Sequence, residues 1–323
     1  MLTNMILKNN KKSSRFLSLF LALAMILACV FSFAGCTKNN VNNKKEVNVS
    51  VTYPLKIKDS YNREVTIDKE PTRIVSLAPN ITETIFALGK GNKLVGRTDY
   101  CDYPKEVNNI TAIGSLTEPN IEKIVELKPD VVIASTHFKK DVLTKLEKMN
   151  IKVVVLYGPE TFDGVYDTIS KVAEVINAKS EADKLVSDMK NKVSSINYKI
   201  KDKNKPKVYY VVSYGKMGDF TSGGDTFIGN MIEMAGGNNA ASDVKGWKYS
   251  VEKLVEKNPD IIICSKYFDA KKGIQQTPGY KDLKAVKDGK LIEIDNNLLD
   301  RQGPRVVDGL ESLAKIIHPE AFK

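Results

Sequence analysis

The sequence predicts an α/β protein with two related lobes, each built on a mainly parallel sheet, joined by one long α-helix and facing each other across a ligand cleft. The strongest observation is a duplication: IEKIVELKPDVVIAS at 121–135 recurs as VEKLVEKNPDIIICS at 251–265, with eight identities in fifteen positions. Runs of β-branched residues alternate with helical segments around both copies, which is the pattern of a parallel sheet. A long amphipathic stretch between the copies predicts the joining helix.

Each copy of the duplication predicts a short helix, a Pro-Asp turn and a fully buried strand. Further strands and helices are expected around both copies. In the first lobe the expected strands are 73–78, 93–98 and 152–157, and the expected helices are 81–89 and 142–150. In the second lobe the expected strands are 207–213 and 291–295, and the expected helices are 226–236 and 304–319.

The joining helix is predicted over 180–203. Its apolar residues recur in steps of three and four, which places them on one helix face. They are Ala182, Leu185, Val186, Met189, Val193, Ile196 and Ile200. Ser180 with Asp183 predicts a capping box at the start. Because Gly and Pro are absent from this stretch, we expect a stiff connection between the lobes; an ordinary core helix of one domain is the alternative.

The N-terminal segment predicts export and a lipid anchor. Basic residues precede an uncharged apolar stretch at 16–35, whose last residues, Ala34 and Gly35, stand directly before Cys36. This pattern is typical of a secretion signal with a lipoprotein cleavage site, and an uncleaved membrane anchor is the alternative. The Asn- and Lys-rich residues after Cys36 are typical of a flexible tether. The predicted parts are a signal peptide at 1–35, a tether at 36–50, a lobe at 51–179, the joining helix at 180–203 and a lobe at 204–323.

The formal net charge of +10 is concentrated near the N-terminus. Residues 51–323 hold 42 basic and 38 acidic side chains, without a dense basic stripe carrying interleaved aromatic residues. Nucleic-acid binding is therefore not expected. Cys101 and Cys264 fall in different predicted lobes, so we expect two separate free thiols.

Residues 72–317 resemble the periplasmic-binding-protein family that serves ABC importers of iron-siderophores, haem and cobalamin. The resemblance is carried by TRIVSLAPNITETIFALG at 72–89, VGRTDYCDYP at 95–104, the first copy of the duplication, FTSGGDTFIGNMIEMAGG at 220–237 and RQGPR at 301–305. It implies two Rossmann-like lobes bridged by one helix. The N-terminal segment resembles that of bacterial lipoproteins, which implies that Cys36 becomes the acylated first residue of the mature protein.

The resemblance further implies a monomeric, lipid-anchored receptor on the extracellular face of the cell membrane. The receptor would capture a metal chelate, a ferric siderophore or cobalamin, and deliver it to the permease dimer of an ABC importer. A haem receptor of the same class is the alternative, and a secreted α/β enzyme is a further one. The chelate is cargo, so no resident cofactor is expected. No nucleophile elbow, phosphate-binding loop or HExxH motif occurs in the sequence, so no catalytic residue is predicted.

The ligand is expected beyond the carboxyl ends of the strands, where open α/β sheets bind their ligands. Aromatic side chains there suit a bulky, partly planar ligand, and the candidates are Tyr100, Tyr214, Trp247 and Tyr267. The resemblance favours Tyr100 and Trp247, because cobalamin-binding members carry aromatic residues at comparable places. Leu116 and Ser135 replace two other aromatic residues of those members.

Three polar residues complete the predicted ligand site. Arg301 and Arg305 lie four residues apart before the last predicted helix, and a guanidinium would pair with a carboxylate, phosphate or catecholate of the chelate; a salt bridge between elements is the alternative. His137 is a candidate axial ligand to haem iron, with a solvated loop position as the alternative. The only other histidine is His318, so no site for a bare metal ion is predicted.

Glu122 and Glu252 occupy matching positions in the two copies of the duplication, each near a predicted helix start. In the family that the chain resembles, one acidic residue on each lobe contacts arginines of the permease, and these two positions match. The resemblance therefore implies a docking role for both. The alternative is that each acid only stabilises its helix through the helix dipole.

Overall fold

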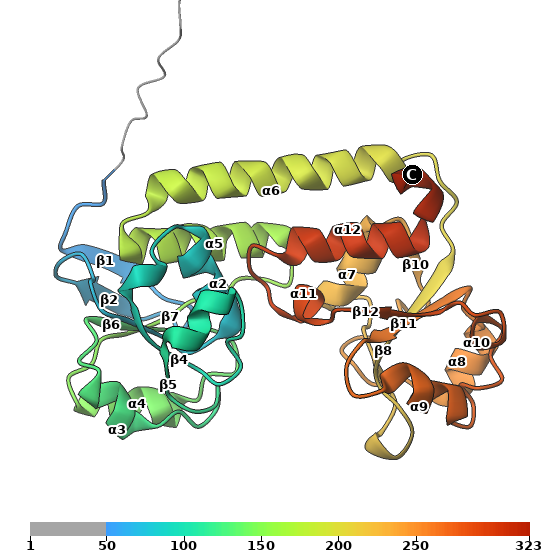
Figure 1. The fold of residues 1–323 in the computed structure, drawn as a ribbon, viewed down its shortest axis with the longest axis horizontal. Helices are drawn as coiled ribbons and strands as arrows, with labels where there is room; N and C mark the ends of the chain where they lie inside the picture. The colour runs from blue at the N-terminus through green and yellow to red at the C-terminus, as the bar shows by residue number, and fades with distance from the viewer. Residues whose placement is uncertain (1–49) are drawn as a thin grey trace, which may run out of the picture. The chain divides into compact units, whose positions relative to one another are not determined.

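The computed structural model describes residues 50–323, which belong to one compact unit (Figure 1). The predicted signal peptide, Cys36 and nearly all of the predicted tether lie outside the described residues. Between residues 50 and 323, no helix is both long enough and apolar enough to cross a bilayer. Two α/β lobes joined by a long helix make up the described chain, which confirms the predicted fold class.

The first lobe contains a parallel sheet in the order β5-β4-β3-β6-β7. The strands are β3 (Ile74–Ser76), β4 (Leu94–Arg97), β5 (Thr111–Ala112), β6 (Val131–Ala134) and β7 (Val153–Val155). The helices are α2 (Pro79–Ala87), α3 (Ile121–Glu126), α4 (Lys140–Lys148) and α5 (Phe162–Ile176), with 3-10 turns η1 (Gly91–Lys93) and η2 (Lys105–Asn109). An antiparallel hairpin of β1 (Leu55–Lys58) and β2 (Glu64–Ile67) precedes them.

The second lobe contains the sheet β10-β8-β11-β12, which is parallel, and β9 pairs antiparallel with β8. The strands are β8 (Lys207–Ser213), β9 (Phe220–Thr221), β10 (Asn238–Asn239), β11 (Ile261–Ser265) and β12 (Leu291–Ile294). The helices are α7 (Phe227–Met234), α8 (Val251–Lys257), α9 (Ala270–Gln276), α10 (Lys284–Lys287), α11 (Asn297–Asp300) and α12 (Val306–Ile317), with 3-10 turns η3 (Gly215–Met217) and η4 (Pro319–Phe322).

Successive residues of the central strands enter different apolar clusters, because side chains alternate between the two faces of a sheet. In β3, Ile74 packs in the cluster that contains α2 and α5, whereas Val75 packs in the one that contains α3 and α4. Both faces are therefore covered, which explains why these strands are continuous apolar runs. Cys101 and Cys264 are buried and free, as predicted.

The duplicated Pro-Asp turn has the same structural role in both lobes. Asp130 accepts hydrogen bonds from the backbone N–H groups of Thr72 (2.8 Å) and Arg73 (3.0 Å) just before β3. Asp260 accepts one from the backbone N–H of Lys207 (2.7 Å) at the start of β8. The Arg73 and Lys207 side chains donate to carbonyls at the ends of α3 and α8, at 2.7 and 2.8 Å. The repeat thus ties each helix end to the first strand of its sheet.

Asp130→Ala is expected to lower the free energy of unfolding by about 1.5 kcal/mol, because it removes charge-assisted hydrogen bonds to a partly exposed carboxylate. Burial opposes ionisation of Asp130, but hydrogen bonds from Thr72 and Arg73 outweigh it and hold its pKa below the usual value. Its contribution is therefore present above about pH 3.9, the unfolded value, and is lost as the pH falls through the lowered folded pKa. Urea unfolding of both proteins at decreasing pH checks this; an unchanged difference at every pH would contradict it.

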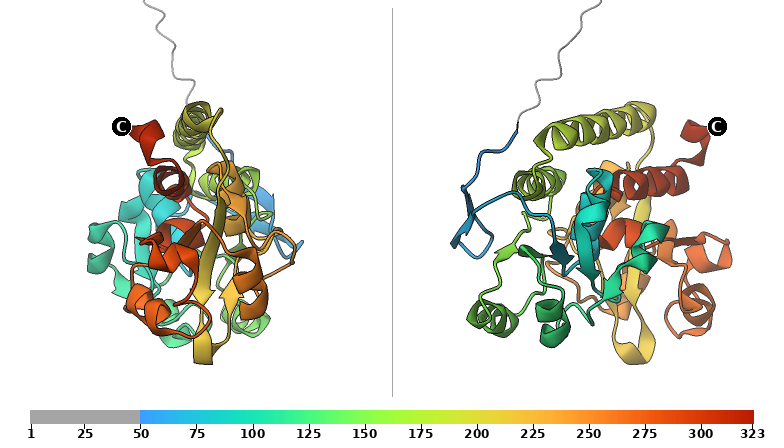
Figure 2. Two further views of the ribbon diagram at one scale, coloured as in Figure 1. Left: turned by 90° about the vertical axis from the view of Figure 1, so that its right-hand side faces the viewer. Right: turned by 60° about the vertical axis from the view of Figure 1, so that its left-hand side comes forward.

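The long helix α6 (Lys179–Ile200) extends over both lobes (Figure 1). The two further views in Figure 2 agree that it lies over α5 and α12, with which it is in contact. Its predicted apolar stripe faces them: Ala182, Met189, Ile196 and Ile200 are buried, and the other three stripe residues are partly buried against the same core.

The predicted capping box of α6 is wrong. The helix begins at Lys179, and its N-cap is Ala178, whose side chain makes no capping hydrogen bond. The reason is the preceding turn: Asn177 adopts a left-handed conformation with φ of 56° and ends α5, so α6 starts before Ser180 is reached. The helix ends at Ile200 rather than at residue 203.

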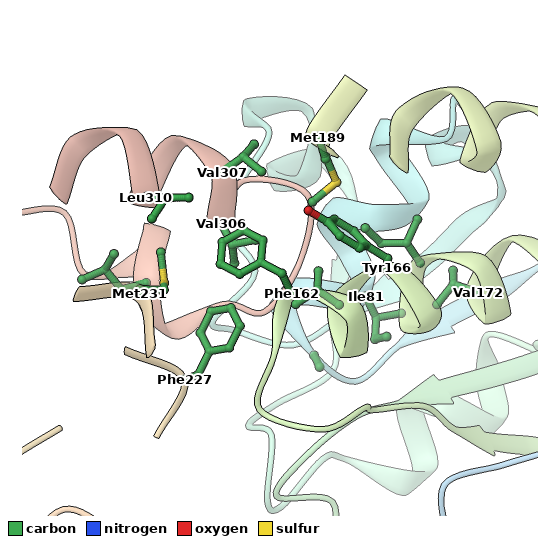
Figure 3. Close-up of a cluster of buried hydrophobic side chains, with 14 of the residues drawn as sticks. Ile81, Phe162, Tyr166, Val172, Met189, Phe227, Met231, Val306, Val307 and Leu310 are labelled. Atoms are coloured by element: carbon green, nitrogen blue, oxygen red, sulfur yellow. The ribbon is translucent and has the colours of Figure 1, made fainter. Parts of the chain in front are cut away.

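The two lobes share one continuous apolar core (Figure 3). Phe162 at the start of α5 stacks on Phe227 at the start of α7, with ring centroids 5.6 Å apart. Around this pair, side chains from five helices meet: Ile81 of α2, Tyr166 and Val172 of α5, Met189 of α6, Met231 of α7, and Val306, Val307 and Leu310 of α12. A large separation of the lobes would expose this core, so the fold favours small movements.

Candidate ligand-binding cleft

The carboxyl ends of strands from both sheets border one cleft between the lobes, with a volume of about 510 Å³. The first lobe contributes residues that follow β3, β6 and β7: Ala78, Pro79, Asn80, Ser135, Thr136, His137, Tyr157, Gly158 and Glu160. The second contributes Phe227, Ile228, Trp247, Asn297, Leu299, Asp300, Arg301 and Gln302. Tyr100, Leu116 and Thr168 complete the lining. Both the volume and the position are typical of a small-molecule site in an α/β fold.

Two aromatic side chains face the cleft while remaining largely open to solvent. Tyr100 follows β4 in the first lobe and is 58% exposed, and Trp247 of the second lobe is 43% exposed. Aromatic rings offer a ligand a large and rigid apolar contact area. One such ring on each lobe provides apolar contact area from both sides of the cleft.

The segment between α11 and α12 crosses the base of the cleft and pairs with the first lobe. Arg305 donates two hydrogen bonds to the Glu83 carboxylate, at 2.8 and 2.7 Å. Arg301 Nη1 donates to Glu83 (3.0 Å) and to Asp102 (2.5 Å), and Nη2 donates to the carbonyl of Tyr100 (3.2 Å). The Glu83 side chain is 2% exposed, so this is a buried ion-pair cluster joining the two lobes.

Other contacts at the base join the same two lobes. Asn80 Nδ2 donates to Ser135 Oγ (3.1 Å) and to the carbonyl of Gln302 (3.3 Å). A side chain at Gly303 would place its Cβ 3.3 Å from the Asn80 carbonyl, so the close approach of the two segments favours glycine there. The Glu160 carboxylate accepts hydrogen bonds from Gln302 Nε2 (2.9 Å) and from the backbone N–H of Phe227 (3.2 Å), the first residue of α7.

The structure places four of the seven predicted ligand residues at the cleft: Tyr100, His137, Trp247 and Arg301. His137 is exposed and has a φ of 62°, a conformation that is uncommon for residues other than glycine. No group of three or more potential metal-ligating side chains lies together among residues 50–323.

Three predicted ligand residues do not line the cleft. Tyr214 packs edge-to-face on Tyr280 inside the second lobe. Tyr267 donates a hydrogen bond to Asp295 (3.1 Å) and accepts one from Asn297 (3.2 Å). Arg305 pairs with Glu83 and lies over the ring of Tyr103, 3.9 Å from its centroid. Each of these side chains is held by contacts with other protein groups, so none of the three is part of the cleft lining.

Three acids that shape the base of the cleft were not predicted from the sequence: Glu83, Asp102 and Glu160. Glu83 lies in a helix otherwise recognised by its apolar residues, and the other two lie in loops. The available signal was the four-residue spacing of Arg301 and Arg305, which brings two guanidinium groups close enough to share one carboxylate. That spacing indicates an acidic partner but does not identify it.

Glu122 and Glu252 have the same local structure in the two lobes. Each is exposed and lies in the first turn of a short helix, α3 or α8. The N-caps are Asn120 and Ser250, whose side chains accept hydrogen bonds from the backbone N–H three residues later, at 2.9 and 3.2 Å. Neither glutamate forms an ion pair within the described part of the chain. Both carboxylates are therefore open to a partner.

Comparison with known proteins agrees with this architecture. A family model described as periplasmic binding protein matches residues 74–298. An uncharacterised ABC transporter substrate-binding lipoprotein of Bacillus subtilis is 35% identical, covering 93% of this chain and 97% of the relative. A cobalamin-binding protein of Halobacterium salinarum is 27% identical, covering 83% and 75%. The apo structure of a periplasmic haem-binding protein from Roseiflexus superposes with a TM-score of 0.72 at 26% identity, covering 77% of this chain and 98% of that one.

Proposed function

Since the chain belongs to the periplasmic binding protein family, we propose that it captures a metal chelate with a broad apolar face, a cobalamin or a ferric siderophore, in its interlobe cleft. Members of this family that resemble it are substrate-binding components of ABC importers and not enzymes, and the same holds for this chain. The observation that carries the ligand class is the pair of half-exposed rings, Tyr100 and Trp247, one on each side of the cleft. Such rings suit a bulky, partly planar ligand that needs a large contact area and a few polar contacts.

Haem is the second candidate, and the position of His137 favours it. This side chain is exposed at the cleft and could contribute one imidazole nitrogen to the iron of a bound haem. The visible spectrum tests this candidate. Haem that is bound through His137 should have shifted absorption bands relative to free haem, and His137→Ala should abolish that shift. Identical spectra for the two proteins would leave cobalamin and ferric siderophores as the candidates.

Titration of the purified protein with cyanocobalamin, haem and a ferric catecholate siderophore tests the proposal. Trp247 is the only tryptophan, so one of these coloured ligands should quench its fluorescence saturably at a one-to-one ratio. Tyr100→Ala should weaken binding of that ligand by about 0.5–1.5 kcal/mol, the range for an aromatic contact beyond its buried area. Tyr198→Ala is the matched control, because this tyrosine of α6 is 83% exposed and lies outside the cleft lining. Absence of saturable quenching by all three would refute the proposal.

We also propose that the protein is anchored to the outer face of the cell membrane through Cys36, as the signal pattern indicates. The Bacillus subtilis relative, which is described as a lipoprotein, supports this proposal. Cys36→Ala should yield a protein that is unprocessed or released, with unchanged affinity for its chelate. Fractionation of cells and mass measurement of the mature N-terminus check the result. A normally processed variant that still requires detergent for extraction would contradict lipidation at this residue.

A further inference from the structure

Arg301 lines the cleft and at the same time lies between two carboxylates of the opposite lobe. Its Nη1 atom is 3.0 Å from Glu83 and 2.5 Å from Asp102. The two carboxylates differ in burial and in the number of their hydrogen bonds. Glu83 is 2% exposed and also accepts two hydrogen bonds from Arg305, whereas the Asp102 side chain is 60% exposed. Within residues 50–323, Arg301 is the one side chain that bonds to Asp102.

The loop that carries Asp102 is fixed on both sides of it. Cys101 is buried between the hydroxyls of Thr82 and Thr98, each 3.2 Å from its sulfur. The ring of Tyr103 lies against the Arg305 guanidinium. The side chains of Asp102 and of the cleft residue Tyr100 remain largely exposed on this loop. The Arg301 side chain is only 12% exposed, but the Asp102 carboxylate is 60% exposed, so water can solvate Asp102 once it leaves Arg301, and its displacement costs less than that of the buried Glu83.

Charge balance decides what a ligand anion would do here. Two arginines, Arg301 and Arg305, bond to two carboxylates, Glu83 and Asp102, and Asp300, which also lines the cleft, interacts electrostatically with Arg301. A ligand carboxylate brought to Arg301 would add a further anion where the two guanidinium groups already have carboxylate partners, and like charges in a poorly solvated site repel strongly. Glu83 cannot leave, because it is buried and bound twice by Arg305. Asp102 is then the group that must move.

We propose that Asp102 is a built-in competitor for the anionic group of the ligand at Arg301, so that residue 102 determines how strongly the cleft prefers anionic over neutral chelates. The proposal rests on the proposed function, because it needs a chelate in the cleft. The step is an exchange of hydrogen-bond acceptors: a ligand carboxylate binds Arg301 as the Asp102 carboxylate moves into solvent. The Glu83–Arg305 pair stays intact and keeps the lobes joined.

The test compares wild type and Asp102→Asn with two pairs of probes that differ in a carboxylate. The pairs are haem with its dimethyl ester, and a monocarboxylic acid derivative of cyanocobalamin with cyanocobalamin itself. For the pair of probes that binds, Asp102→Asn should increase the affinity for the acid by about three- to fivefold. This factor corresponds to the free energy of a weak ion pair. Affinity for the matching ester or neutral form should not change. Asp99→Asn is the matched control, because it removes the same charge from an exposed position of the same loop.

The outcomes are distinguishable. Two results would overturn the competition while leaving the proposed function in place. One is that Asp102→Asn binds the acid with the same affinity as wild type. The other is that Asp102→Asn gains affinity equally for the acid and for its neutral partner. The gain should also vanish in Arg301→Ala with Asp102→Asn, because the shared guanidinium is then absent. If wild type bound none of the four probes and no ferric catecholate siderophore, both the proposed ligand class and the competition would be refuted.

Discussion

Glu83→Ala should destabilise the protein by about 3–5 kcal/mol, the usual cost of removing one partner from a buried ion pair. The Glu83 carboxylate accepts two hydrogen bonds from Arg305 and one from Arg301. Without it, Arg301 retains Asp102, but Arg305, whose side chain is 17% exposed, loses both of its charged hydrogen bonds. Chemical unfolding at neutral pH measures the change.

The matched control for Glu83 is Glu64→Ala. Glu64 forms an ion pair with Lys56 on the β1–β2 hairpin, and both side chains are more than half exposed. Its removal should cost less than about 1 kcal/mol. A similar small loss for both variants would show that the cluster at the base of the cleft does not hold the lobes together. A large loss for Glu83 alone would support an interlobe role.

The double variant Glu122→Ala/Glu252→Ala should lose most of its uptake through the importer while keeping its fold and its affinity for the chelate. A receptor that presents one acid per lobe can place two equivalent contacts on two related permease subunits. Each contact is individually weak, about 0.2–1 kcal/mol, so the single variants should show smaller losses. Because exposed charges act largely on association, the remaining uptake of the single variants should become more sensitive to salt.

The matched control for docking is Glu126→Ala/Glu256→Ala, which removes the same charge from the same two helices, one turn later. If only net charge mattered, both double variants would lose uptake equally. If the glutamates served only the helix dipole, Glu122→Ala/Glu252→Ala would lower stability by about 0.3–1 kcal/mol per helix and transport normally. Measurement of unfolding, chelate binding and uptake on the same preparations separates these results, and normal uptake would exclude the docking role.

The architecture could be predicted because local and repeated patterns in the sequence specify it. The apolar stripe of α6 predicted a helix facing the core, and four of its seven residues are buried with the rest packed beside them. The β-branched runs predicted central strands, and the duplication predicted two equivalent turns, which Asp130 and Asp260 form in the same way. The start of α6 was missed because the left-handed turn at Asn177 is a property of the preceding helix end.

The fold class, the two-lobed duplication, and the place of Glu122 and Glu252 at two helix starts follow from local patterns, since periodicity and capping act between residues close together in the chain. The partners of the arginines depend instead on long-range packing. Arg305 and Glu83 are 222 positions apart, and Arg301 and Asp102 are 199 apart. No local sequence pattern connects residues so far apart. They come into contact because α2 packs against the segment before α12. Separate tertiary contacts hold the three predicted residues that do not line the cleft: Tyr214 packs on Tyr280, Tyr267 bonds to Asp295, and Arg305 bonds to Glu83. These contacts join residues far apart in the chain, which no local pattern specifies.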